Sequence, residues 1–336
     1  MTLSGAMPLG ESRIPLPRSD VVLPLLGLGT WAWGDRSTWG MKGYDRSYDV
    51  ETIREAYARS VAAGITLLDT AEAYGNGESE RIIGRLLEED RENRARIVVA
   101  TKFLPFPWKL ALSSALLTSL KASLERLRLP AVHLYQIHGP ISLRSHAAMA
   151  DALAAAHAAG LVKAVGVSNY SAAEVRAIHT ALAKHAIPLA TNQIEFSLLR
   201  TMPASNGLLA ACKELGVVVL AYSPIGQGRL TGKYNARNPP PGRRQFSDFP
   251  MAEIDPIVAE LRRMGEYHGG KTPAQVALNW IICKGAIPIP GAKNKEQAEQ
   301  NAGALGWRLS DEEVAELDAV GKVGQRKLFH RFWQHG

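Results

Sequence analysis

The sequence alternates short apolar segments with amphipathic helical patterns, and this alternation repeats along most of the chain. The short segments are aliphatic or β-branched on both faces, which is typical of parallel strands buried on both sides. The expected strands are residues 25–29, 66–69, 97–101, 134–138, 164–167, 189–193, 217–221 and 286–290. The expected helices are residues 50–63, 78–89, 112–128, 144–159, 172–185, 204–215, 273–284 and 310–320. Eight strand–helix alternations within about 270 residues predict an α/β fold, a (β/α)8 TIM barrel.

Capping signals support several of these helices. Ser171 with Glu174, and Ser310 with Glu313, have the spacing of capping boxes. Thr272 precedes a proline and lies three residues before Gln275, which also predicts a helix start.

A doubly wound sheet is the alternative fold. Its usual signature is G-x-G-x-x-G between a first strand and a helix. Here Gly27 and Gly29 are followed by a polar, aromatic loop, residues 30–34, and no helix is expected to start there. The sequence therefore favours the barrel.

The domain organisation follows from the same pattern. Residues 14–320 are expected to form a single barrel domain, preceded by a disordered segment, residues 1–13, and followed by a C-terminal tail, residues 321–336. Residues 14–23 predict a β-hairpin that caps the barrel floor. Residues 223–272 contain a proline-rich run and predict a long loop after the seventh strand.

Composition excludes several classes of protein. The net charge is +7, but lysines and arginines are dispersed, which argues against nucleic-acid binding. The chain contains no apolar run long enough to span a membrane and no secretory signal at its start. Two cysteines suit a reducing compartment and define no metal site. A cytoplasmic monomer or weak oligomer acting on a small molecule is expected.

Polar residues follow nearly every expected strand. They are Thr30, Asp69, Lys102, His138, Ser168, Asn169, Gln193, Tyr222 and Ser223. Because parallel strands of a barrel end on one face, these side chains are expected to meet there. Taken singly, Asp69 could be a helix cap, His138 a buried structural histidine and Lys102 a surface amine. Together with Tyr74 they predict an acid/base site.

The motifs around these residues resemble those of the aldo-keto reductase superfamily. The run Gly64-x-x-x-Leu68-Asp69-Thr-Ala71-x-x-Tyr74-Gly75, followed by Glu80-x-x-Ile-Gly84, is similar to its first signature. Further matching segments follow in the family's order: 100–102, 136–138, 166–169, 192–193, 221–224 and 289–292. The region after Tyr222 is more similar to the bacterial and plant branches than to the animal steroid-reducing branch.

The resemblance implies an oxidoreductase that reduces an aldehyde or ketone to an alcohol, with Tyr74 as the proton donor. Lys102 is expected to lower the pKa of the Tyr74 phenol because an adjacent ammonium favours the phenolate. Asp69 is expected to hold Lys102 by ion pairing, and His138 to fix the substrate oxygen by a hydrogen bond.

The resemblance also implies NADPH (NADP+) lying extended across the barrel mouth. Ser168, Asn169 and Gln193 would bind the nicotinamide carboxamide, and Tyr222 would stack on its ring. Glycine-rich residues after Ser223 would approach the pyrophosphate, and Lys293 would favour the 2′-phosphate. The family commonly has glutamate where this chain has Gln300. The full expected set is Gly29, Thr30, Trp31, Ser168, Asn169, Gln193, Tyr222, Ser223, Ile225, Gly226, Gln227, Gly228, Leu230, Lys233, Gly291, Ala292, Lys293, Gln297, Gln300 and Asn301.

Aromatic residues in loops after the first and third strands predict an apolar substrate pocket. They are Trp33, Phe103, Phe106 and Trp108. The aromatic tail, with Phe329, Phe332 and Trp333, could close over this pocket or dock on the side of the barrel. Candidate substrates are pyridoxal, simple aldehydes, sugars and polycyclic ketones.

Two other functions fit parts of this pattern. One is a nicotinamide-binding, redox-sensing regulatory subunit with little turnover. The other is a phosphate-handling barrel isomerase or aldolase in which Lys102 forms a Schiff base. The complete set of Asp69, Tyr74, Lys102 and His138 favours carbonyl reduction.

Overall fold

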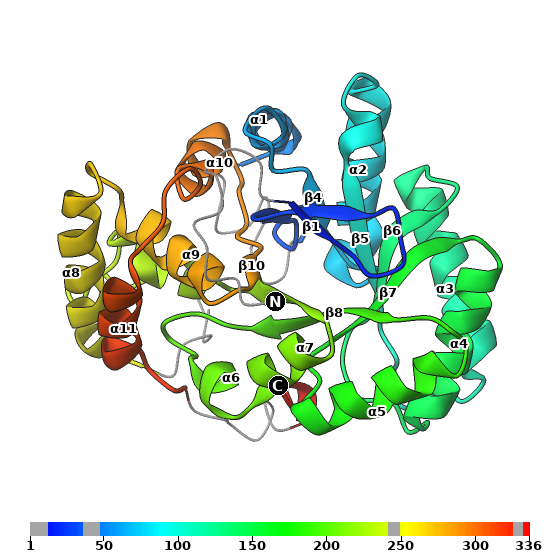
Figure 1. Cartoon of the computed structure of the whole chain (residues 1–336). Helices are drawn as coiled ribbons and strands as arrows, with labels where there is room; N and C mark the ends of the chain where they lie inside the picture. Colours follow the sequence, from blue (N-terminus) through cyan, green and yellow to red (C-terminus); the bar gives the residue numbers. More distant parts are fainter. Residues whose placement is uncertain (1–12, 36–47, 241–248, 325–331) are drawn as a thin grey trace.

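The computed structural model describes residues 13–35, 48–240, 249–324 and 332–336 (Figure 1). The expected disorder at the N-terminus therefore lies almost wholly outside the described residues. In the described part, an eight-stranded parallel sheet runs in the order β10-β9-β8-β7-β6-β5-β4-β3. Its strands are β3 Gly27–Gly29, β4 Leu67–Asp69, β5 Val98–Phe103, β6 Val132–Ile137, β7 Val162–Ser168, β8 Leu189–Glu195, β9 Val218–Tyr222 and β10 Ile287–Pro288.

The sheet closes on itself between its first and last strands. Gly29 and Gly291 form a parallel bridge, and the Gly29 amide donates to the Pro290 carbonyl at 2.9 Å. A Cβ at Gly29 would lie 2.7 Å from the Ile289 carbonyl oxygen, so only glycine allows this close approach. The predicted (β/α)8 barrel is confirmed.

Helices surround the barrel, as the outer ring of ribbons in Figure 1 shows. They are α1 Val50–Ala62, α2 Glu78–Glu89, α3 Leu112–Leu127, α4 His146–Ala158, α5 Ala172–Ala183, α6 Met202–Ser205, α7 Leu208–Glu214, α8 Met251–Tyr267, α9 Pro273–Cys283, α10 Lys295–Ala302 and α11 Asp311–Val320. Short 3-10 helices occur at η1 Tyr74–Gly77, η2 Arg94–Arg96 and η3 Gly226–Thr231. The capping boxes at Ser171, Thr272 and Ser310 are all present.

Buried apolar side chains form two layers. The larger lies between the strands and the helices, and the smaller fills the barrel. The predicted hairpin, β1 Arg13–Pro15 and β2 Val22–Pro24, is antiparallel. Its Leu16 and Leu23 join Leu67 and Val98, which lie at the beginnings of strands, in the inner layer. The hairpin therefore closes the floor and leaves the opposite end for the site.

The prediction of a long loop over residues 223–272 is wrong in part. This region contains η3 and the whole of α8. The helix buries Met251, Ile254, Val258 and Leu261, a spacing of three and four residues that predicts a helix. Pro256 lies inside α8, where it removes one backbone hydrogen bond, and this proline and the nearby proline-rich run obscured the periodicity.

The single helix predicted over residues 204–215 is also wrong. The chain instead forms α6 and α7, separated at Gly207, whose φ is +85°. Glycine adopts this left-handed conformation at little cost, so the chain can turn between the two helices. Among the described residues, no helix combines the length and apolar character needed to cross a membrane.

Candidate active site

The expected acid/base residues meet at the carboxyl end of the barrel. Lys102 Nζ lies 2.6 Å from Asp69 Oδ2 and 3.3 Å from the Tyr74 hydroxyl, and it donates to the Thr70 carbonyl at 2.8 Å. The rings of Tyr74 and His138 meet edge to face, with centroids 5.7 Å apart. The Lys102 side chain is fully buried, so its ion pair with Asp69 is shielded from water.

Strand register and one turn produce this arrangement. In the parallel pair β4–β5, Asp69 is in register with Ala100, and side chains two residues apart point to the same face, so Lys102 follows on that face. Tyr74 begins the 3-10 turn after β4, where its amide donates to the Ala71 carbonyl at 3.0 Å. His138 directly follows β6.

The buried setting controls the charge of each group. Burial lowers the pKa of Lys102, while Asp69 acts against this effect. Burial lowers the pKa of His138 well below its usual value, and the Lys102 ammonium adds to this shift, so the imidazole is neutral near pH 7. Its Nδ1 is buried without a hydrogen-bond partner in the described part of the chain.

The expectation that Lys102 lowers the pKa of Tyr74 is wrong for this structure. Burial raises the pKa of Tyr74 well above its usual value, and the Asp69 carboxylate raises it further. The reason is that desolvation opposes the phenolate, and the negative charge of Asp69 opposes it as well. Tyr74 is therefore protonated near pH 7.

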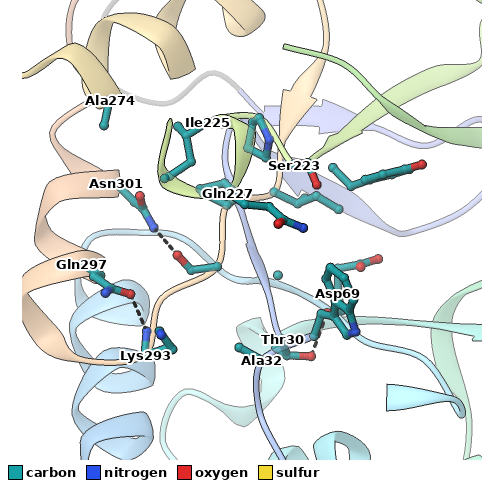
Figure 2. Close-up of a pocket in the computed structure, with 18 of the residues that line it drawn as sticks. Thr30, Ala32, Asp69, Ser223, Ile225, Gln227, Ala274, Lys293, Gln297 and Asn301 are labelled. Atoms are coloured by element: carbon teal, nitrogen blue, oxygen red, sulfur yellow. Dashed lines mark hydrogen bonds between the residues drawn. The ribbon is translucent and has the colours of Figure 1, made fainter. Parts of the chain in front are cut away.

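A cavity of about 1210 Å³ lies at the barrel mouth, and Figure 2 shows part of its lining. Most of the expected cofactor residues line it: Gly29, Thr30, Trp31, Ser168, Asn169, Gln193, Tyr222, Ser223, Ile225, Gln227, Gly228, Lys233, Gly291, Lys293, Gln297, Gln300 and Asn301. Asp69, Tyr74 and His138 line the same cavity. Lys102 lies behind them.

Residues at or near the ends of five strands, β4, β6, β7, β8 and β9, form a continuous hydrogen-bonded group. The Tyr222 hydroxyl donates to Asn169 Oδ1 at 2.8 Å. Asn169 Nδ2 donates to the His138 carbonyl and to Ser168 Oγ, both at 3.1 Å. Ser168 Oγ donates to the Gln193 carbonyl at 2.8 Å, and Gln193 Nε2 donates to Asp69 Oδ1 at 2.6 Å.

The η3 segment supplies polar groups to another wall. The Gln227 side chain points into the cavity in Figure 2. Its amide oxygen and nitrogen are both buried and have no hydrogen-bond partner in the described residues. Buried amides are rarely left unpaired, so these atoms point to a ligand.

The far end of the cavity is built by α10. Its N-cap, Asn294, follows Lys293, whose amide donates to Gln297 Oε1 at 3.0 Å. Asn301 Nδ2 donates to the Gly291 carbonyl at 3.2 Å, which ties α10 to the end of β10 (Figure 2). A helix N-terminus beside a lysine favours an anionic group.

Several expected site residues do not line the cavity. Gly226, Leu230 and Ala292 are buried behind its wall. Trp33 and Phe103 are fully buried in the core layer, and Trp33 Nε1 donates to the Ala292 carbonyl at 2.9 Å. Both side chains belong to the buried core and neither lines the cavity, which corrects their assignment to the substrate pocket. Phe106 and Trp108 stack on each other, and the Trp108 side chain is 71% exposed.

Other residues that line the cavity were not predicted from the sequence, and for the C-terminal tail the sequence allowed two positions. Leu104, Tyr234, Thr272 and Ala274 have no pattern that distinguishes them from ordinary loop or helix residues. From the tail, Trp333 and Gln334 line the cavity, and the Trp333 ring lies 5.5 Å from that of His138. Of the two positions considered for the tail, residues 332–336 therefore adopt the one at the cavity. Phe329 lies outside the described residues.

Comparison with known proteins agrees with this geometry. The model of the Aldo/keto reductase family matches residues 25–322. The chain is 37% identical over 323 residues to a chloroplastic pyridoxal reductase of Arabidopsis thaliana. The alignment covers 92% of this chain and 86% of that protein.

Solved structures show the same fold. A glycerol dehydrogenase from Gluconobacter oxydans superimposes with a TM-score of 0.77 at 29% identity, covering 94% of this chain and 98% of that one. An aldo-keto reductase from Klebsiella pneumoniae, solved in complex with NADPH, has a TM-score of 0.72 at 26% identity and covers 94% of this chain and 97% of that one. With its barrel, its buried Asp69–Lys102 pair and the family match over most of its length, the chain belongs to the aldo/keto reductase family of oxidoreductases.

Proposed function

We propose that this protein reduces an aldehyde or ketone to an alcohol with NADPH, and that Tyr74 donates the proton. The observation that carries the proposal is the buried contact of Tyr74 and Lys102 at the wall of a deep cavity. The Tyr74 hydroxyl is protonated and Lys102 Nζ donates to its oxygen, so the ammonium stabilises the charge that develops as the proton leaves.

His138 and Asp69 support this transfer. The neutral His138 ring lines the cavity beside Tyr74, where it can donate a hydrogen bond to the carbonyl oxygen of the substrate. Asp69 holds Lys102 in place and favours its charged form against the effect of burial. The two groups orient the substrate and preserve the charge of the ammonium.

The residues present fit NADPH. Small-molecule pockets usually measure roughly 300–1,000 Å³, and this cavity exceeds that range, as a dinucleotide with a substrate requires. Bound NADPH would supply the hydride that reduces the carbonyl carbon. Ser168, Asn169, Gln193 and Tyr222, here named the nicotinamide platform, would hold its ring and carboxamide. The unpaired Gln227 amide would bind nearer the pyrophosphate, and Lys293 with the α10 N-terminus would bind the 2′-phosphate.

The substrate class is best approached through the relative of 37% identity, which is a pyridoxal reductase. The test is NADPH oxidation at 340 nm with pyridoxal, simple aliphatic and aromatic aldehydes, sugars and polycyclic ketones. Turnover with at least one class supports the proposal, and pyridoxal is the first substrate to try. Tight NADPH binding without turnover of any carbonyl would instead favour the redox-sensing alternative. Failure to bind NADPH would overturn the proposed function.

A further inference from the structure

We propose that Gln334 is a positioning residue that fixes the Tyr222 hydroxyl of the nicotinamide platform. This inference rests on the proposed function, because it concerns how the platform is prepared to hold the carboxamide. Gln334 comes from the C-terminal segment, residues 332–336, and its side chain lines the cavity while only 5% exposed.

The Gln334 amide contacts the platform directly. Its Nε2 donates to the Tyr222 hydroxyl oxygen at 2.6 Å and to Glu195 Oε2 at 3.0 Å. The segment is held beside the platform by the amides of His335 and Gly336, which donate to the Asn169 carbonyl at 3.0 and 3.2 Å. His335 Nδ1 also lies 2.8 Å from Glu174 Oε1.

Glu195 fixes which way the Gln334 amide faces. A carboxylate oxygen accepts hydrogen bonds, so the group 3.0 Å from Glu195 Oε2 must be the amide nitrogen. The amide oxygen is then turned away, and it is buried without a partner in the described residues. Burying an unpaired carbonyl oxygen costs free energy. The two hydrogen bonds of the Gln334 amide nitrogen offset that cost and so stabilise this orientation.

This orientation makes the Tyr222 oxygen an acceptor and so determines where the Tyr222 proton points. The Tyr222 oxygen accepts from Gln334, so its own proton goes to Asn169 Oδ1. Burial raises the pKa of Tyr222 well above its usual value, so the proton is present. The Asn169 amide nitrogen is held by the His138 carbonyl and by Ser168 Oγ, whose own proton goes to the Gln193 carbonyl.

The platform consequently presents acceptors to a ligand. Asn169 Oδ1 and Ser168 Oγ each keep one lone pair, and Gln193 keeps its amide oxygen because its nitrogen is bonded to Asp69. A nicotinamide carboxamide carries an NH2 donor that matches these oxygens. Without Gln334, the Tyr222 hydroxyl loses one of its two hydrogen-bond partners and is free to rotate or shift, so part of the binding energy of the nicotinamide is lost in ordering Tyr222.

The experiment compares two ligands on three variants. Gln334→Leu removes the donor, and Gln334→Glu replaces it with a group that only accepts. Phe332→Ala, a change of a 59% exposed residue in the same segment, is the control. The dissociation constants of NADPH and of 2′,5′-ADP, which has no nicotinamide, are measured by fluorescence titration and calorimetry.

The expected result is that both Gln334 variants bind NADPH at least about threefold more weakly, as the loss of one or two hydrogen bonds predicts. Binding of 2′,5′-ADP stays within twofold of wild type, which also shows that the variants are folded, and Phe332→Ala binds both ligands normally. Unchanged NADPH binding, or equal weakening of both ligands, would overturn the role of Gln334. Wild-type protein that fails to bind NADPH would overturn the proposed function instead.

Discussion

Gln193 Nε2 lies 2.6 Å from Oδ1 of Asp69, whose other oxygen accepts from Lys102 at the same distance. One buried carboxylate therefore joins the acid/base residues to the nicotinamide platform. The contact spans 124 positions in the sequence and links the ends of β4 and β8. A change at Asp69 is therefore expected to disturb both Lys102 and Gln193.

Replacing Asp69 by asparagine is expected to destabilise the fold. Lys102 would be left as a buried charge without its counterion, a change that costs about 3–5 kcal/mol. Burial already lowers the pKa of Lys102, and loss of Asp69 would lower it further. The free energy of unfolding is measured by urea denaturation. The control, Asp20→Asn, removes an exposed ion pair with Lys163 and should cost less than about 1 kcal/mol. Similar small losses in both variants would contradict this account of the buried pair.

Replacing Tyr74 by phenylalanine is expected to reduce kcat at least about 100-fold, because the proton donor is lost. NADPH affinity should stay within twofold of wild type, since the ring is retained. The matched control is Tyr57→Phe, which removes a hydroxyl that donates to Asp90 at 3.0 Å, away from the cavity. Steady-state kinetics and cofactor titration provide the measurements. If Tyr74→Phe kept a tenth of the wild-type kcat, the donor would be another group.

Replacing Lys293 by alanine is expected to weaken NADPH binding roughly tenfold while leaving NADH binding unchanged, because a charge-assisted bond to the 2′-phosphate is lost. The Lys293 ammonium lies 4.8 Å from the ring centre of Tyr48, which favours one position of the side chain. Lys163→Ala, which removes the partner of Asp20, is the control. Dissociation constants for both cofactors test the prediction, and an equal effect on NADPH and NADH would refute it.

Stability is expected to fall as the pH drops below about 6.5. Burial lowers the pKa of His138 well below its usual value and also lowers the pKa of His133. Below the unfolded pKa, the unfolded chain binds protons that the folded chain does not, so acid favours unfolding. The slope is up to about 1.4 kcal/mol per pH unit for each histidine. Urea denaturation at several pH values should give a shallower slope for His138→Gln, and an identical slope would show that His138 does not contribute.

Trp33 is expected to stabilise the barrel and not to contact substrate. Trp33→Phe removes the hydrogen bond to the Ala292 carbonyl and leaves a buried acceptor, which costs about 1–3 kcal/mol. Trp108→Phe, at an exposed position, should change stability by less than about 0.5 kcal/mol. Thermal and urea denaturation are compared with KM for the best substrate. A raised KM for Trp33→Phe without loss of stability would restore Trp33 to the pocket.

Much of the site could be predicted because its residues lie near strand ends, and local sequence patterns predict where the strands end. Each of Asp69, Lys102, His138 and Gln193 lies within two residues of the carboxyl end of a strand, and parallel strands bring these ends to one face. The strand pattern alone therefore predicts that these residues meet. The starts of several helices could also be predicted, because a capping box is a contact between residues three positions apart in the sequence.

Other features depend on contacts that no local pattern encodes. Trp33 and Phe103 are of the residue types that line apolar pockets. Their hydrophobicity predicts that the rings are buried, but it does not show whether the protein core or a ligand covers them. The protonation of Tyr74 depends on the balance between desolvation and the Asp69–Lys102 pair, which is a property of the packed barrel. The presence of Lys102 in the sequence could not predict that balance.

The sequence by itself determined the barrel and the face at which Asp69, Lys102 and His138 meet, because strand periodicity and motif spacing are short-range properties of the chain. Only the tertiary structure decided that Gln334 contacts Tyr222, from which it is separated by 112 positions. No periodicity links the tail to the end of β9. Their contact arises because the folded barrel brings a buried carboxylate, a phenol and an amide to one place, where each satisfies hydrogen bonds that water would otherwise make.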